Sequence, residues 1–283
     1  MSEKVSVIQV GGSVEQAEQG NYQLDTKAIF SEAWQYTLKA RVSIMLGLCF
    51  ALFLGMIVSY IASNYLGGME VVFEDPQAGM ILNILVTVVI WPFLAGVEMM
   101  GVFHAVGMKT HVGLVFSFLK RGSWVAVCAL LTSSLISIGF QLLIFPGVFL
   151  AVVLSLTIPL VVEKQMTPMK AIVLSVKALR FKWWQLTSIY MLLIMCLLAL
   201  LFPVALLADS AIAPLSIILF IFGMTYLAPF YYNVKGILYR EIFGVKIATN
   251  TSNNSESNQS DNEENDNEHT AINKNGPDDT FSA

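Results

Sequence analysis

Residues 42–65 read VSIMLGLCFALFLGMIVSYIASNY and contain no charged side chain. A helix needs about 20 apolar residues to cross a hydrocarbon core of about 30 Å, so this stretch is long enough to span a membrane. Residue Arg41 stands directly before it, and the next cation along the chain is Lys109. Between them, residues 66–79 carry acids but no cation, and residues 80–108 are again mostly apolar. Residues 42–108 therefore predict a helical hairpin that crosses a membrane twice.

Two further stretches, residues 122–163 and 183–234, are apolar and free of lysine and arginine. All 16 Lys and Arg residues of the chain lie outside these three stretches. Because Lys and Arg stay on the cytoplasmic side during insertion, this distribution predicts three hairpins with both termini in the cytoplasm. We expect an all-α polytopic fold with six transmembrane helices, at residues 42–65, 80–108, 122–145, 147–163, 185–208 and 212–234.

The composition agrees with a membrane protein, since 56% of residues are hydrophobic and only 13% are charged. Soluble domains carry about 25% charged residues. The net charge of −4 comes from the segment after Ile247, which is rich in Asn, Ser, Asp and Glu. We expect a polar cytoplasmic leader at residues 1–26, a membrane domain at 27–247 and a disordered acidic tail at 248–283. This charge balance gives no reason to expect a nucleic-acid partner.

A basic segment that is amphipathic or interfacial is expected before each hairpin. In the first, a helix beginning at Lys27 and capped by Asp25 or Thr26 has an apolar face that includes Trp34. In the third, Thr167 and a following proline predict a helix start, and Trp183 and Trp184 end the segment. We expect the three tryptophans to lie at the membrane interface as anchors. We expect the lipid bilayer to be the partner and the cations to attract anionic lipids.

The second hairpin is the shortest, because only 42 residues separate Arg121 from Lys164. Pro146-Gly147 falls near the middle and is the expected turn. This placement leaves two helices of barely sufficient length for a span.

Glu98 is the one acid deep inside an expected span, which makes it a candidate intramembrane polar site. Charged side chains are costly there, so a partner or a task is expected. One interpretation is structural pairing with a Lys or Arg of an interfacial helix. Another is a role in transport or ligand binding, and a third is a neutral, protonated glutamate without a task.

Other chemistry-bearing residues form no recognisable site. His104 lies six residues after Glu98, about 240° around a helix, so the two do not share a face and no metal pair is expected. The three cysteines, Cys49, Cys128 and Cys196, stand singly within expected spans and form no CxxC pair. No nucleophile elbow, phosphate loop or HExxH motif is present. We therefore expect no cofactor, no metal and no catalytic residue.

Residues 146–184 read PGVFLAVVLSLTIPLVVEKQMTPMKAIVLSVKALRFKWW. A Pro-Gly turn begins a span that ends in proline and paired valines, followed by an acidic-basic step and a basic helix with aromatic residues. This pattern resembles an uncharacterised family of bacterial six-span inner-membrane proteins, and the membrane domain joined to some glycerophosphoryl diester phosphodiesterases. The resemblance implies the bacterial cytoplasmic membrane. In the phosphodiesterases the chemistry belongs to a separate soluble domain, and we expect none in this chain.

Two classes of function fit these observations. The first is a non-catalytic membrane module that organises lipids or partner proteins, and the basic segments flanked by tryptophan motivate it. The second is a transporter of a small or lipid-like substrate that uses Glu98. An intramembrane enzyme is a third class, which no motif supports.

Overall fold

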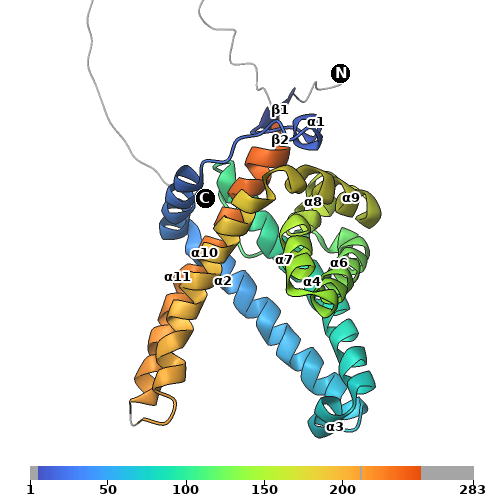
Figure 1. Ribbon diagram of the computed structural model, residues 1–283, viewed down its shortest axis with the longest axis vertical. Helices are drawn as coiled ribbons and strands as arrows, with labels where there is room; N and C mark the ends of the chain where they lie inside the picture. Colours follow the sequence, from blue (N-terminus) through green and yellow to red (C-terminus); the bar gives the residue numbers. More distant parts are fainter. Residues whose placement is uncertain (1–5, 211, 250–283) are drawn as a thin grey trace, which may run out of the picture. The chain divides into compact units, whose positions relative to one another are not determined.

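The computed structural model describes residues 6–210 and 212–249, and Figure 1 shows their arrangement. Within this part, every helix belongs to one compact unit, residues 7–247. A second unit, residues 1–6 and 248–283, lies almost entirely outside the described residues. In chain order the elements are β1 (Ser6–Val10), α1 (Val14–Glu18), α2 (Thr26–Tyr65), α3 (Met69–Glu74), α4 (Pro76–Ala105), α5 (Leu114–Ser117), η1 (Leu119–Arg121), α6 (Gly122–Leu142), α7 (Ile144–Val153), α8 (Thr157–Glu163), α9 (Pro168–Leu179), η2 (Arg180–Lys182), α10 (Trp183–Leu206), α11 (Ala213–Phe243) and β2 (Val245–Thr249).

Six helical stretches in the described residues are long and apolar enough to cross a membrane. The all-α, multi-pass membrane fold expected from the sequence is therefore confirmed. Helix α2 ends at Tyr65, where the first expected span ends, and α10 ends at Leu206, two residues before the expected end of the fifth span. The stretches are Thr26–Tyr65, Pro76–Ala105, Leu114–Leu142, Ile144–Glu163, Pro168–Leu206 and Ala213–Phe243.

The expected interfacial helix and the first span form one continuous helix, α2, with a break at Ala40. There φ is −136° and ψ is 19°, outside the helical range. The Asp25 carboxylate accepts hydrogen bonds from the backbone N–H groups of Lys27 and Ala28 and so caps the helix start. The break lies between two cations, at the predicted boundary between the interfacial segment and the span.

Helix α11 packs against both α4 and α2 and forms the centre of the unit. The crossing with α4 is close because glycines face each other. A Cβ added to Gly236 would lie 2.1 Å from the carbonyl oxygen of Gly101, and a Cβ added to Gly101 would lie 2.2 Å from that of Tyr232. Small residues of this kind let helix backbones approach in a membrane. The fold therefore brings the polar residues of α4 and α11 into direct contact.

The second hairpin differs from the sequence-based expectation in where it turns. The break lies at Leu143, which is extended with φ −163° and ψ 156°, and α7 begins at Ile144. The expected turn residues Pro146 and Gly147 instead lie inside the first turns of α7. Proline is tolerated there because its missing N–H would have had no helical partner. The expected span at 147–163 is also divided, into α7 and α8, by a turn at residues 154–156.

The ends of the chain contain structure that the sequence did not suggest. The polar leader contains β1 and α1, and β1 pairs with β2 in a two-stranded sheet. Helix α11 continues to Phe243, nine residues beyond the expected end of the last span. Of the tail predicted to be disordered, residues 250–283 lie outside the described part of the chain.

Candidate functional site

Four polar side chains lie on the last part of α11, about three turns, and are largely removed from solvent: Asn233, Lys235, Tyr239 and Arg240. Each contacts a different neighbour on α2, α4 or α8. We call them and their partners the polar cluster. Its members are Glu32, Thr37, Glu98, His104, Glu163, Asn233, Lys235, Tyr239 and Arg240.

Glu98 of α4 forms a buried ion pair with Lys235 of α11. The Nζ to Oε1 distance is 2.6 Å, and only 8% of the lysine side chain and 4% of the glutamate side chain are exposed. The second carboxylate oxygen of Glu98, Oε2, is buried and has no hydrogen-bond partner among the described residues. The acid expected from the sequence is thus paired, but with a cation of the last helix and not of an interfacial helix. The close crossing at Gly101 and Gly236 explains this pairing, because both glycines lie within one turn of the charged residues.

A chain of neutral hydrogen bonds runs beside the ion pair. His104 Nδ1 lies 2.8 Å from Asn233 Oδ1, and its Nε2 lies 2.6 Å from the Thr110 hydroxyl. The Asn233 amide donates to the Thr37 hydroxyl at 3.0 Å, and Thr37 donates to the carbonyl of Ala33 at 2.8 Å. Because the Asn233 oxygen accepts, the consistent assignment has the histidine proton on Nδ1 and the Thr110 hydroxyl donating to Nε2. The chain joins α2, α4 and α11 without an unpaired imidazole nitrogen.

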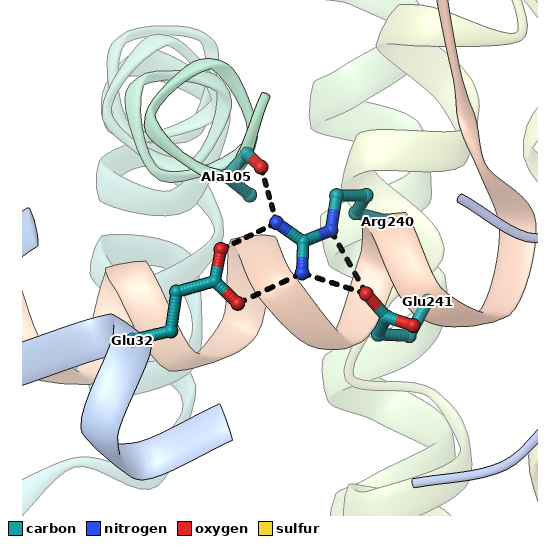
Figure 2. Close-up of polar contacts among 4 residues, drawn as sticks. All are labelled: Glu32, Ala105, Arg240 and Glu241. Carbon is teal, nitrogen blue, oxygen red and sulfur yellow. Dashed lines mark hydrogen bonds and ion pairs between the residues drawn. The ribbon is translucent and has the colours of Figure 1, made fainter. Parts of the chain in front are cut away.

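Arg240 holds three segments together at the end of α11 (Figure 2). Its two terminal nitrogens bond the two carboxylate oxygens of Glu32 at 2.6 and 2.9 Å. The same guanidinium bonds Glu241 and the carbonyl oxygen of Ala105, the last residue of α4. Such a two-point contact matches the planar fork of arginine and would not be reproduced by lysine. The start of α2 and the end of α4 are thereby tied to α11.

Glu163, at the end of α8, completes the polar cluster. Its carboxylate accepts a hydrogen bond from the Tyr239 hydroxyl at 2.8 Å and one from the backbone N–H of Lys246 at 3.1 Å. It also pairs with Lys164 at 3.1 Å, and the Lys164 ammonium donates to the carbonyl of Gly244 at 2.9 Å. These contacts join the second hairpin to the end of α11.

An apolar cavity of about 680 Å³ lies beside the polar cluster, between α2, α7, α10 and α11. Its few polar groups include Ser155, Thr187 and three tyrosines. The Tyr190 hydroxyl donates to Ser155 at 2.9 Å, whereas the Thr187 hydroxyl is buried without a partner. Lys235 lies four residues after Tyr231, one helical turn further along α11. The lining residues are Met45, Leu48, Cys49, Leu52, Phe140, Val148, Ala151, Val152, Ser155, Thr187, Tyr190, Met191, Leu193, Ile194, Leu197, Met224, Leu227, Ala228, Tyr231 and Tyr232.

The three expected anchors occupy different surroundings. Trp34 is partly exposed and packs on Tyr226 and Phe230 of α11, with ring centroids 6.2 and 5.9 Å apart. Trp184 is exposed, and Trp183 packs against α7. Their place at the membrane interface stays a prediction.

Sequence reasoning found Glu98 but missed the residues that complete the polar cluster. By the distribution of cations alone, Lys235 and Arg240 only mark the end of the last span. A signal was present, since Asn233, Gly236 and Arg240 recur at the i, i+3, i+7 spacing of one helix face. This spacing indicates that the helix continues, as α11 does. In the described residues, no group of three or more His, Cys, Asp or Glu side chains is placed to hold a metal ion.

Comparison of the chain with protein-family models, with curated proteins and with solved structures finds no match.

Proposed function

We propose that this chain is a non-catalytic module of the bacterial cytoplasmic membrane that binds lipid and has both termini in the cytoplasm. The observation that carries the proposal is the cavity of about 680 Å³ between α2, α7, α10 and α11. Its volume lies within the range of about 300 to 1,000 Å³ that is usual for sites of small ligands.

The chemistry of the lining favours an amphiphile. Apolar side chains from five helices form most of the wall, which suits acyl chains, since these gain dispersion contacts from a complementary surface. Ser155, Tyr190 and Tyr231 also line the cavity, and their polar groups suit the carbonyl or hydroxyl of an amphiphile.

The charges of the polar cluster support a structural role for that cluster. Glu98 is engaged by Lys235, Glu32 by Arg240 and Glu163 by Tyr239 and Lys164. A transporter remains the second candidate because Glu98 Oε2 is buried without a partner, as a proton or ligand site would be.

Anionic lipids are the proposed partners at the membrane surface. Helix α9 exposes Lys170 and Lys177, while its apolar side chains Ile172 and Leu179 are buried against the protein. Near an anionic membrane each such cation contributes about 1 kcal/mol. Because Ile172 and Leu179 are covered by the protein, this attraction should be tested on the whole protein and not on a peptide.

The absence of catalysis is also part of the proposal. It accords with the resemblance of residues 146–184 to the membrane domain of glycerophosphoryl diester phosphodiesterases, in which a different domain carries the chemistry.

Native mass spectrometry of the full-length protein, released gently from membranes, tests both candidates. Ala228→Phe fills the cavity, whereas Ala205→Phe adds the same bulk on an exposed position of α10 outside it. A lipid adduct that is lost only in Ala228→Phe supports the lipid module. The double variant Glu98→Gln/Lys235→Gln removes the buried charges together. A small polar molecule lost in this double variant would favour the transporter, and identical adducts in all four proteins would contradict both.

A further inference from the structure

We propose that the hairpin formed by α6 and α7 does not carry its tip to the opposite face of the membrane. Its tip, residues 142–145, inserts into the hydrocarbon of the leaflet on which α10 begins. In this arrangement the tip is a lipid-docking surface, and α6 and α7 return to the face from which they came. The inference does not depend on lipid binding in the cavity.

The tip has the composition of a lipid-facing surface and not of a loop in water. Residues 142–145 read LLIF, and these four side chains are between 62% and 76% exposed. The other two hairpins turn through acids, at Glu70, Glu74 and Asp75 in one and at Asp209 in the other. A contiguous exposed apolar patch marks a site of protein or membrane contact.

The turn is closed by two backbone hydrogen bonds and by a close approach of α6 and α7. The N–H of Leu143 donates to the carbonyl of Gly139 at 3.1 Å, and the N–H of Gly147 donates to that of Leu143 at 3.3 Å. A Cβ added to Gly139 would lie 3.0 Å from the Cα of Gly147, so the two helices are close at the turn. Polar backbone groups must be satisfied internally where water is absent. These two hydrogen bonds, together with the missing N–H of Pro146, satisfy part of this turn.

Ring contacts place the tip beside the start of α10. The ring centroids of Phe145 and Trp183 are 5.4 Å apart, and those of Phe149 and Trp183 are 5.7 Å apart. Trp183 is the first residue of α10. Two rings in contact cannot lie on opposite sides of a hydrocarbon core of about 30 Å. The tip and the start of α10 therefore lie toward the same face.

The start of α10 is itself fixed near the start of α2. The Gln185 side-chain amide donates to the carbonyl of Leu24, directly before the Asp25 cap of α2. The Tyr22 hydroxyl donates to the carbonyl of Ala178 in α9 at 2.8 Å. Burial raises the pKa of the Tyr22 hydroxyl to about 12, so the donor is retained at any physiological pH. Both contacts belong to the face that carries the basic segments.

The far end of α7 also contacts this face. The Ser175 hydroxyl of α9 donates to the carbonyl of Val153 at 2.6 Å. Contacts at Phe145, Phe149 and Val153 thus join nearly the whole of α7 to the start of α10 and to α9. A helix that crossed from the opposite face would meet this segment only at one end. By length and composition, α6 and α7–α8 could each cross the membrane. The contacts of α7 with α9 and with the start of α10 favour a hairpin that does not cross.

The experiment places a fluorophore on single cysteines of the full-length protein after Cys49, Cys128 and Cys196 are replaced by alanine. The positions are Leu143→Cys at the tip, Trp184→Cys at the start of α10 and Ile212→Cys at the turn between α10 and α11. All three positions are exposed. Right-side-out and inside-out membrane vesicles each receive a nitroxide-labelled lipid that enters only the accessible leaflet. Each variant is used only if it elutes from size-exclusion chromatography like the parent protein.

We expect the tip fluorophore to be quenched more strongly in the vesicle orientation that quenches the Trp184→Cys position. Quenching that is equal in the two orientations, or stronger in the orientation that quenches Ile212→Cys, would overturn the proposal. The two controls report the faces directly, so the result holds whichever face is cytoplasmic.

Discussion

Removing one partner of the Glu98–Lys235 pair should be among the most costly single changes in this protein. The pair is nearly out of solvent, and the lysine ammonium makes its described hydrogen bond to Glu98 alone. Breaking a buried pair by removing one partner costs about 3 to 5 kcal/mol. Glu98→Gln should therefore lower the free energy of unfolding by about that amount.

Glu98→Gln and Lys235→Gln should lower the free energy of unfolding by different amounts. A buried charge that has lost its partner can become neutral. At pH 7 this costs about 4.6 kcal/mol for an ordinary lysine and about 3.7 kcal/mol for an ordinary glutamate. The cost of neutralisation sets an upper limit on the free energy of unfolding that each single variant loses through its isolated charge. Glu98→Gln, which leaves the lysine alone, is expected to be more costly than Lys235→Gln. The double variant should lose less than either single variant, because no isolated charge remains.

The assay is a titration with sodium dodecyl sulfate in mixed micelles, followed by the fluorescence of the five tryptophans. Glu74→Gln is the matched control, because Glu74 is exposed and has no partner among the described residues. Its effect should stay within about 0.5 kcal/mol. If the losses of the two single variants simply added in the double variant, the two side chains would not interact and the reasoning would fail.

Three further predictions use the same titration. Gly236→Ala places a methyl group 2.1 Å from a carbonyl oxygen of α4 and should cost about 1 to 3 kcal/mol. Gly113→Ala, on an exposed position beside a flexible histidine ring, should change little, and equal losses would contradict the close crossing. Arg240→Lys keeps the charge but loses the two-point contact with Glu32, so a loss of about 1.5 to 3 kcal/mol is expected, and unchanged stability would argue against that contact. Asn233→Leu leaves buried hydrogen-bonding groups on α2 and α4 unpaired and should cost about 1 to 3 kcal/mol, whereas a neutral result would mean that the chain of hydrogen bonds is not formed.

The membrane character and most helix boundaries were predictable from the sequence because they depend on local properties. An uncharged run such as residues 42–65 has the length of a span by itself. The break at Ala40 lies between Lys39 and Arg41, where the apolar pattern begins. Asp25 was one of two expected caps, and its carboxylate makes the capping hydrogen bonds.

The polar cluster was not predictable in the same way, because it depends on which helices meet. A single sequence shows that Glu98 needs a partner but not which of many cations supplies it. The choice of Lys235 follows from the approach of α4 and α11 at Gly101 and Gly236, two positions that are far apart in the sequence. The expected end of the last span at Val234 was set by the first cation after it, whereas α11 continues to Phe243.

The second hairpin shows a different limit of sequence patterns. Apolar composition and about 20 residues are necessary for a span but do not decide whether a helix crosses. The pattern placed the turn at Pro146 and Gly147, whereas the chain breaks at Leu143. The contact between Phe145 and Trp183 joins two positions that the sequence had assigned to opposite faces.

The distribution of buried residues connects the polar cluster to the proposed lipid site. In α10 the buried residues end at Leu193, and in α11 all but Ser216 lie from Pro229 onward. The other halves of these helices therefore have little protein to pack against. The cavity lies where the packing ends, with Tyr190 and Tyr231 on its wall. The polar cluster fixes one end of α11, so the proposed lipid would support the remainder of the α10–α11 hairpin. A ligand that binds only this folded arrangement raises its stability with the logarithm of the ligand concentration, so the proposed lipid would stabilise the fold as well as bind to it.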